Sequence, residues 1–135
     1  MVETASAVTD THPLLFHAAG GRRLGRRAAG FFARAEAHEA VVYVPAAVIW
    51  ECSLLARAAR VNLRRTVQAF FDDLFSNPAY QPLDLTPEQI YLADELRFTR
   101  DPFDGLICAA ARTLNLPLIT RDGAIRESGA VDALW

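Results

Sequence analysis

The sequence contains no lysine, only two cysteines and no long apolar run. Cys52 and Cys108 each fall in an apolar helical pattern without C-x-x-C spacing, which predicts two reduced, buried thiols and no disulfide framework. The longest apolar stretch, residues 41–50, is well short of the roughly 18 to 20 residues that a membrane-spanning helix needs. The first residues also lack a basic segment followed by an apolar one. The sequence therefore predicts a cytoplasmic protein without a membrane partner.

Charge is divided unevenly along the chain, although the net charge is only −2 and all fourteen basic residues are arginine. Residues 21–65 carry nine arginines and three acids, or +6, whereas residues 66–135 carry five arginines and eleven acids, or −6. Such asymmetry can indicate a nucleic-acid partner, and the guanidinium group pairs well with phosphate oxygens. The arginines of the first segment either contact phosphates or form a solvated polar face.

The length of 135 residues and the hydrophobic content of 52% predict one globular domain, residues 1–135. Residues with strand patterns alternate with residues at helical spacing. We expect strands at 6–10, 41–44, 83–85, 116–120 and 131–134. We expect helices at 11–19, 24–38, 46–60, 62–75, 87–98 and 101–114, with a single helical turn at 123–127. This alternation predicts an α/β fold of three layers, α/β/α, on a central and mainly parallel sheet.

Acidic residues stand where these elements meet. Asp10 ends the first expected strand and Asp122 follows the fourth, and the carboxyl ends of parallel strands share the edge of the sheet where ligands bind. The stretch "RDPFDG" places Asp101 and Asp104 at the start of an apolar helix that enters from this edge. Glu51 projects from the helix after the second strand. The sequence therefore predicts that the carboxylates of Asp10, Glu51, Asp104 and Asp122 converge.

A cluster of this kind is electrostatically unfavourable on its own. Two carboxylates about 4 Å apart repel by roughly 4 kcal/mol at an effective dielectric constant of about 20. A protein tolerates such repulsion only with a compensating cation or with raised pKa values. Surroundings made of oxygen ligands alone suit Mg²⁺ or Mn²⁺ rather than Zn²⁺. The cluster therefore predicts a site for one of these hard divalent ions.

Each acid also has a purely structural interpretation. Asp101 fits an N-cap, and Asp104, at the third helical position, favours the positive end of the helix dipole without being needed as a cap. Asp10 fits an N-cap for the helix that follows it. Asp122 fits a turn, and Glu51 fits a solvated helix face. Each interpretation is satisfactory alone, but none explains why all the acids fall at successive strand ends and helix starts.

Four blocks carry a resemblance to a known family. These are VTDTHPLLF (8–16), VIWE (48–51), RDPFD (100–104) and LITRD (118–122). In this order they resemble the blocks of PIN-domain proteins, particularly the VapC-like ribonuclease toxins, and the likeness covers essentially the whole chain. The resemblance implies a PIN fold and a metal-dependent endoribonuclease, in which ions activate a water for in-line attack on an RNA phosphodiester and stabilise the departing oxygen.

The resemblance also implies a role for each acid of the cluster. Asp10 and Asp104 are the central ligands of Mg²⁺ or Mn²⁺. Glu51 and Asp122 bind a second ion or hold metal-bound waters, so that the number of ions stays open. Asp101 either caps its helix or assists.

Two further residues of these blocks have auxiliary roles with structural alternatives. Thr120 either orients a carboxylate or a hydrated metal through its hydroxyl, or belongs to a local turn at the strand end. His12 matches a common family residue, and we prefer a structural hydrogen-bonding role over general-base catalysis because the metal can supply the hydroxide.

The toxin branch of the family implies a protein partner, an antitoxin whose tail fills the groove and blocks the acidic site. Helices 24–38 and 45–75 are candidates for its surface, provided that their apolar side chains are exposed and not core. The aromatic residues concerned are Phe31, Phe32, Phe70, Phe71 and Phe75. Family members are commonly homodimers, and the sequence neither requires nor excludes this.

Three other functions compete with the ribonuclease. A catalytically silent PIN module that binds RNA or a protein would have no need of converging carboxylates. A phosphatase with an aspartate nucleophile would use a D-x-D motif, but His12 stands two residues after Asp10. A nucleotide-binding domain would need a phosphate-cradling loop, and the segment GGRRLG (20–25) lacks both G-x-G-x-x-G and the Walker lysine.

Overall fold

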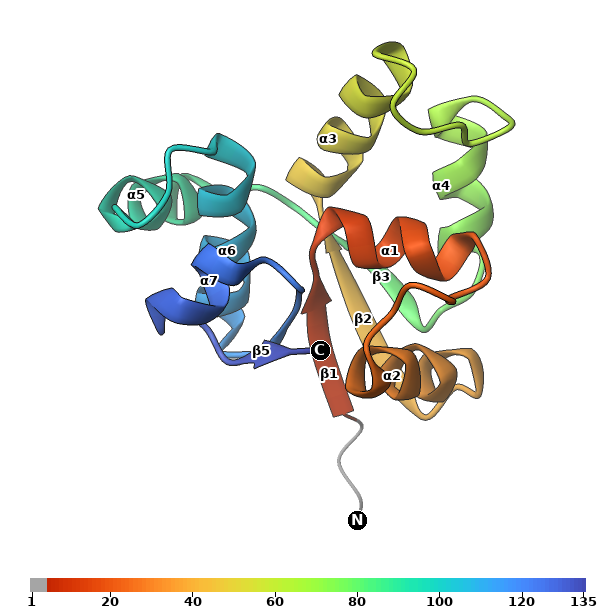
Figure 1. Cartoon of the computed structure of the whole chain (residues 1–135), viewed down its shortest axis with the longest axis horizontal. Helices are drawn as coiled ribbons and strands as arrows, with labels where there is room; N and C mark the ends of the chain where they lie inside the picture. The colour runs from red at the N-terminus through yellow and green to blue at the C-terminus, as the bar shows by residue number, and fades with distance from the viewer. Residues whose placement is uncertain (1–4) are drawn as a thin grey trace.

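A five-stranded parallel sheet forms the centre of the computed structural model, which describes residues 5–135 (Figure 1). The strand order is β3-β2-β1-β4-β5, and every strand pair is parallel. Val8 of the central strand lies opposite Tyr43 on one side and Leu118 on the other. The strands are β1 (Ala5–Thr9), β2 (Ala40–Pro45), β3 (Tyr80–Leu83), β4 (Leu118–Ile119) and β5 (Ala133–Leu134).

Helices connect the successive strands, as parallel pairing requires. They are α1 (Thr11–Ala18), α2 (Arg26–Glu36), α3 (Ala46–Arg57), α4 (Val67–Phe75), α5 (Pro87–Glu95), α6 (Pro102–Leu114) and α7 (Gly123–Ser128). Helix α2 packs against β2, and α6 packs against β1 and α5. The α/β fold with a parallel sheet flanked by helices is thus confirmed. Within residues 5–135, every helix is too short or too polar to span a lipid bilayer.

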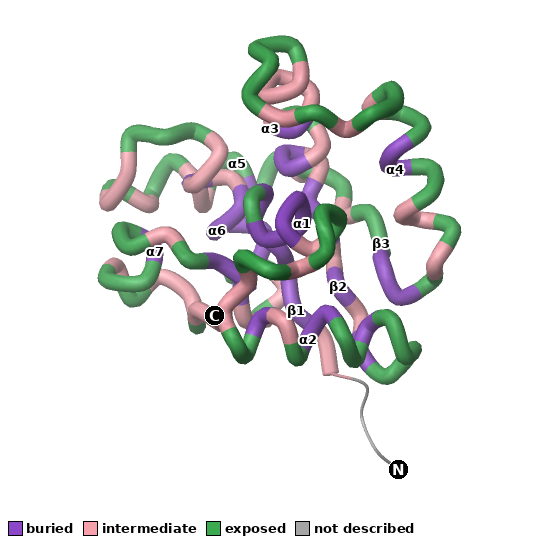
Figure 2. The backbone as a smooth tube through the Cα atoms, turned by 45° about the vertical axis from the view of Figure 1, so that its right-hand side comes forward, coloured by how far each residue is buried: buried purple, intermediate pink, exposed green. Residues whose placement is uncertain are grey.

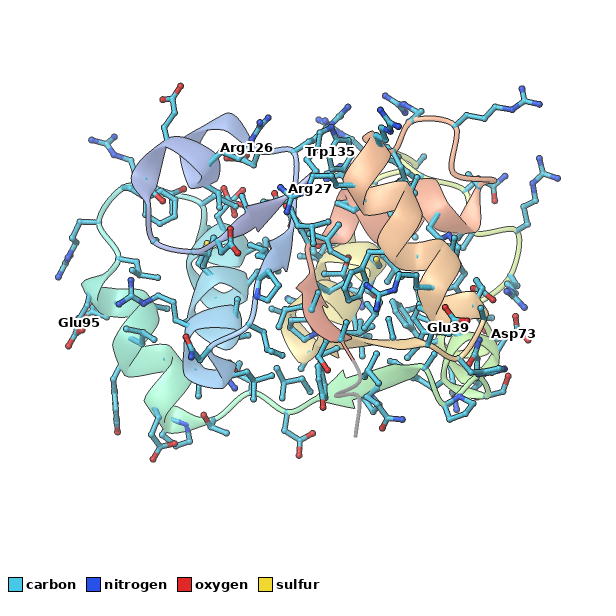
Figure 3. The ribbon with its side chains drawn as sticks, turned by 90° about the horizontal axis from the view of Figure 1, so that it is seen from below. Arg27, Glu39, Asp73, Glu95, Arg126 and Trp135 are labelled. Atoms are coloured by element: carbon cyan, nitrogen blue, oxygen red, sulfur yellow. The ribbon has the colours of Figure 1, made fainter. Side chains whose placement is uncertain are left out.

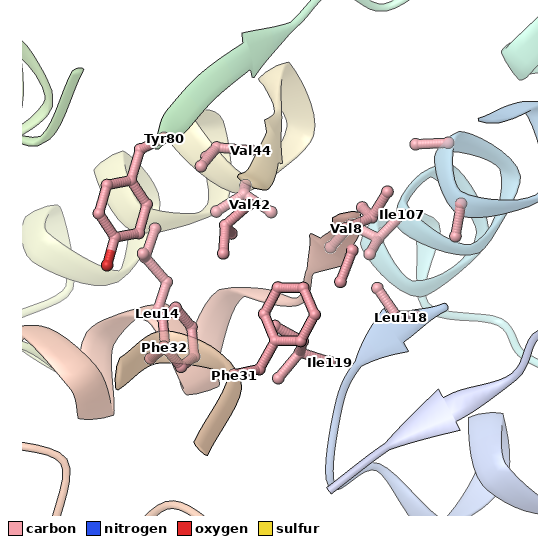
Figure 4. Close-up of a cluster of buried hydrophobic side chains, with 14 of the residues drawn as sticks. Val8, Leu14, Phe31, Phe32, Val42, Val44, Tyr80, Ile107, Leu118 and Ile119 are labelled. Carbon is pink, nitrogen blue, oxygen red and sulfur yellow. The ribbon is translucent and has the colours of Figure 1, made fainter. Parts of the chain in front are cut away.

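The core lies on both faces of the sheet. Leu118 is directed toward Ile107 of α6, and the next residue, Ile119, toward Phe31 of α2 (Figure 4). Because successive residues of a strand point to opposite faces, this short strand joins both helix layers. Figure 2 shows the same pattern over the whole chain, with buried backbone along the central strands and exposed backbone in the peripheral turns.

The expected buried thiols are present. Cys52 and Cys108 are free and fully buried, on α3 and α6. Burial raises the pKa of each thiol to about 12, so that both are protonated and unreactive at neutral pH. Both cysteines therefore act as small apolar core residues.

The aromatic residues suggested as an antitoxin surface belong mainly to the core. Phe31 and Phe32 of α2 and Phe70 and Phe71 of α4 are all buried, and Phe75 is partly buried against them. The core interpretation of these residues is thus correct, and a partner surface must consist of other side chains.

The expected helix over 62–75 is wrong at its start. Asn62 does not begin a helix, because its side-chain oxygen accepts a hydrogen bond from the Arg64 amide at 2.8 Å and forms a turn. The helix begins after Thr66, whose hydroxyl accepts from the Ala69 amide at 3.1 Å. The residues between α3 and α4 are therefore an extended loop, and this loop carries three arginines.

The expected strand at 83–85 is also misplaced. The strand is β3, four residues long, and begins at the buried Tyr80. Pro82 lies within it opposite Val44. A proline disfavours a central strand because it cannot donate to the ladder, but β3 is at the edge of the sheet, where one side needs no partner.

Candidate active site

The strand order reverses at the carboxyl edge of the sheet between β1 and β4. The chain leaves β1 toward β2 on one side, whereas β4 adds to the other side. This switch point is where ligands bind in open α/β sheets, because the loops diverge and leave a crevice. Asp10 follows β1 here and Thr120 follows β4.

A hydrogen bond joins these two neighbouring strand ends. The hydroxyl of Thr120 donates to Asp10 Oδ2 at 2.7 Å and accepts from the amide of Asp122 at 3.1 Å. Thr120 is fully buried and Asp10 is 8% exposed. The hydroxyl therefore orients one carboxylate directly and fixes the backbone that carries another.

Asp10 is also the N-cap of α1. Its Oδ1 atom accepts from the Thr11 amide at 2.8 Å, as the structural interpretation predicts. A carboxylate has about four lone-pair positions, so these two hydrogen bonds leave acceptor capacity on both oxygens. Capping and ligation are therefore compatible at this residue.

The two acids at the start of α6 have different partners. Asp101 is the N-cap, and its Oδ1 atom accepts from the Phe103 amide at 2.9 Å. Asp104 forms no such bond within residues 5–135, and its nearest polar partner is the Thr99 hydroxyl at 3.5 Å. Capping thus explains the first aspartate of "RDPFDG" but not the second, to which the described chain offers the helix dipole and the long contact with Thr99.

The acids converge on one small cleft of about 310 Å³, which we call the acidic cleft. Glu51 reaches it from α3 with a partly buried side chain, so the solvated-face interpretation is incomplete. Asp122 reaches it while also capping α7 through the Ile125 amide at 2.9 Å. The lining residues are Asp10, His12, Pro13, Glu51, Asp101, Asp104, Arg121 and Asp122.

His12 does not form the structural hydrogen bond expected for it. Its side chain is exposed at the mouth of the acidic cleft and makes no hydrogen bond to another group in residues 5–135. The ring lies 6.1 Å from that of Phe16, centroid to centroid, in a tilted arrangement. The imidazole is thus free to meet a ligand in the cleft.

Burial, together with the charges of neighbouring acids, raises the pKa values of Asp10, Glu51 and Asp104. Burial and the charges of Asp101, Asp10 and the other acids raise the pKa of Asp104 to about 7. Burial, with the charges of Asp10 and Asp101, also raises the pKa of Glu51. Burial raises the pKa of Asp10 against the opposing effect of the Thr120 hydrogen bond. The cleft therefore favours protons or other cations.

The donor set fits a hard divalent ion that keeps part of its hydration shell. As the side chains stand, no three histidine, cysteine or acidic groups within residues 5–135 lie close enough to hold an ion by themselves. Mg²⁺ retains several waters and takes few protein carboxylates, so direct contact with every acid is not required. The carboxylates supply oxygen alone, as this ion prefers.

Two residues at the cleft had no role in the sequence analysis. Arg121, between Thr120 and Asp122, is the only basic lining residue besides His12 among those described. The hydroxyl of Thr99 accepts from the Asp101 amide at 3.0 Å and braces the loop before α6. For Arg121, its place between Thr120 and Asp122 in the block "LITRD" could have indicated a position at the cleft.

Comparison with known proteins agrees with this fold. The model of the PIN domain family matches residues 7–130. No curated protein sequence matches the chain. Solved structures with the same fold include VapBC2 from Rickettsia felis bound to a DNA fragment from their promoter, with a TM-score of 0.68, 14% identity and coverage of 95% of this chain and 96% of that one.

Two further solved structures are similar. DNA-bound VapBC from Salmonella typhimurium has a TM-score of 0.65 and 13% identity, with 96% of each chain covered. A toxin-antitoxin complex from Klebsiella pneumoniae has a TM-score of 0.58 and 19% identity, with 86% of each chain covered. At these identities the likeness shows the fold alone. The family match, which spans most of the chain, shows that this protein belongs to the PIN domain family.

Proposed function

We propose that this PIN domain is a metal-dependent endoribonuclease and the toxin of a toxin–antitoxin pair. The observation that carries the proposal is the convergence of Asp10, Glu51, Asp104 and Asp122 from four different parts of the chain on one cleft. A cluster that raises the pKa of Asp104 to about 7 is unfavourable for folding. Such a cluster is typical of a site whose charges act on a ligand.

In this proposal the acids bind the ion or its waters, and Thr120 orients one of them. Asp10 and Asp104 hold Mg²⁺ or Mn²⁺, while Glu51 and Asp122 hold a second ion or its waters. Thr120 keeps the carboxylate of Asp10 oriented through the bond at 2.7 Å. A bound ion would supply a nucleophile from water at neutral pH and stabilise charge on the phosphate.

The proposed partners are an RNA substrate and an antitoxin. The likeness to a toxin-antitoxin complex supports the second of these. An antitoxin that covers the acidic cleft would inhibit by denying RNA access to it. A homodimer and a cytoplasmic location are consistent with this proposal and are not needed for it.

The first test is cleavage of a mixed pool of structured RNAs by purified protein, with Mg²⁺ or Mn²⁺ against EDTA. Asp104→Asn should abolish cleavage and keep the fold, because it removes a charge without removing a cap. Asp72→Asn, an exposed acid on α4, is the matched control and should cut normally. Equal activity of the Asp104→Asn variant and the unmodified protein would overturn the site.

A thermal-shift titration with Mn²⁺ separates a silent module from an enzyme that lacks its specific RNA. Mn²⁺ should raise the Tm of the unmodified protein, because an ion that binds only the folded state stabilises it. The Asp104→Asn variant should show little shift. If neither protein shifts and neither cuts RNA, the chain is a PIN module without nuclease activity.

A further inference from the structure

A second and larger cleft of about 930 Å³ lies beside the acidic one. Its walls are α1, the end of α3, the loop that follows α3, and α4. Five arginines line it together with apolar side chains, and none of its described lining residues is acidic. We call it the arginine cleft, after Arg23, Arg60, Arg64, Arg65 and Arg121.

The two clefts adjoin, because His12 and Arg121 line both of them. Arg121 stands between Thr120 and Asp122 in the chain, yet its guanidinium group is directed toward the ring of Phe16, 4.7 Å from the centroid. Arg23 stacks on the same ring at 4.5 Å. The ring therefore holds two cations at the junction of the clefts.

Most of these arginines have no internal counter-charge. Within residues 5–135, Arg65 pairs with Asp73 at 3.1 Å, and the other four form no salt bridge. Arg60 and Arg64 belong to the loop that replaced the expected helix start. Arg64 has a φ of 61° and Ala59 a φ of 54°, which is uncommon for residues other than glycine. The loop therefore has an energetically unfavourable backbone conformation at these residues, and its Arg60 and Arg64 side chains have no salt-bridge partner in the described chain.

We propose that the arginine cleft holds the single-stranded RNA that flanks the phosphate to be cut, an inference that rests on the proposed ribonuclease function. Guanidinium groups pair with phosphate oxygens, and the apolar lining residues Leu15, Leu55 and Val61 suit an unstacked base. Because Arg121 and His12 line both clefts, a strand in the arginine cleft would lie next to the carboxylates. An acidic protein segment could meet the same guanidinium groups and also reach the acidic cleft, so the test below compares RNA with an acidic polypeptide.

The test measures binding and not cutting. Fluorescence anisotropy with a short labelled single-stranded RNA of mixed sequence, in EDTA, compares the unmodified protein with the double variant Arg60→Gln/Arg64→Gln. The matched control is Arg26→Gln/Arg27→Gln, which removes the same charge from exposed residues outside both clefts. Each phosphate contact contributes about 0.7 to the slope of log K against log salt concentration for a single strand.

Loss of two contacts should therefore reduce the slope by about 1.4 and the affinity at about 0.1 M salt roughly 25-fold, whereas the control should bind nearly as the unmodified protein does. An equal loss of RNA affinity in both double variants would overturn the inference, because net charge alone would then explain the binding. The inference would also be overturned if the double variant Arg60→Gln/Arg64→Gln lost more affinity for poly-glutamate than for RNA. That result would indicate that the cleft binds an acidic protein segment.

Cleavage by the same proteins with Mg²⁺ separates this inference from the proposed function. If the unmodified protein cuts RNA and the double variant binds RNA normally, the arginine cleft assignment fails and the ribonuclease stands. If the unmodified protein binds RNA through Arg60 and Arg64 but never cuts, the cleft assignment stands as an RNA-binding site and the nuclease fails. If it neither binds nor cuts, both are overturned.

Discussion

Removal of the Thr120 hydroxyl tests most directly how the site is built. Thr120→Val keeps a side chain of nearly the same shape and deletes only the oxygen. That oxygen donates to Asp10 Oδ2 at 2.7 Å and accepts from the Asp122 amide at 3.1 Å. Both Thr120 and Asp10 are buried, so that water does not readily replace the lost bonds.

The expected loss follows from these two bonds. A hydrogen bond to a charged group contributes about 1.5 to 3 kcal/mol and a neutral one about 1 kcal/mol, so Thr120→Val should lower the free energy of unfolding by about 2.5 to 4 kcal/mol. Thr120→Ser keeps the hydroxyl and loses a buried methyl group, at about 1 kcal/mol. The two variants should then differ by roughly 1.5 to 3 kcal/mol, or about 5 to 12 °C in Tm for a chain of this size.

Urea unfolding in EDTA at about pH 8, where the Asp10 carboxyl is more fully ionised, measures these differences. The same Thr120→Val change in the Asp10→Asn background should be milder by about 1 kcal/mol or more, because the charged acceptor is gone. Equal losses from Thr120→Val and Thr120→Ser would refute the reasoning, since the methyl group and not the hydroxyl would then matter. An unchanged effect in the Asp10→Asn background would show that the bond to Asp10 contributes little.

Three further predictions concern other parts of the chain. Gly25→Ala should destabilise the fold by about 1 to 3 kcal/mol and alter tryptophan fluorescence, because an added Cβ would lie 2.5 Å from the indole of Trp135, which packs beside the start of α2 (Figure 3). Gly30→Ala, on the same helix with open space around it, should be neutral or stabilising, and equal effects of the two changes would contradict the packing argument. Tyr80→Phe should lower the free energy of urea unfolding by about 1.5 kcal/mol, the low end for a charged acceptor, because the hydroxyl donates to the half-exposed carboxylate of Glu36 at 2.7 Å; no change would mean that water replaces this bond. In EDTA, stability should fall as the pH rises from about 4 to about 7, because the folded protein, in which the pKa of Asp104 is raised to about 7, binds this proton more tightly than the unfolded chain does. Asp104→Asn should flatten that fall between about pH 4 and about pH 7, and an equal slope in both proteins would assign the fall to other groups.

Much of the fold could be predicted because periodicity and strand ends are local properties of the sequence. The strand at β2 and the helix at α6 follow from an apolar β-branched run and from a cap with proline at the first helical position. The start of α4 was missed because two residues competed for it. Asn62 and Thr66 both favour helix caps, and only tertiary structure decides that Asn62 closes a turn.

The acidic residues could be predicted from topology, since the ends of parallel strands meet at one edge. Their fine arrangement could not. The bond from Thr120 to Asp10 joins residues 110 positions apart, and no local pattern reports its direction. The contact of the Arg121 guanidinium group with the Phe16 ring likewise depends on where α1 lies relative to the end of β4. Sequence patterns name the groups at such a site, whereas packing decides which of them touch.

The two proposals together require that ion and RNA binding depend on each other. Without an ion, the carboxylates of the acidic cleft repel the phosphate that the neighbouring arginines attract. A divalent ion in the acidic cleft removes this repulsion, and RNA affinity should then rise. Linkage requires that RNA raise the affinity for the ion by the same factor. Because Arg121 lines both clefts, its substitution should change this coupling more than substitution of any other arginine of the arginine cleft.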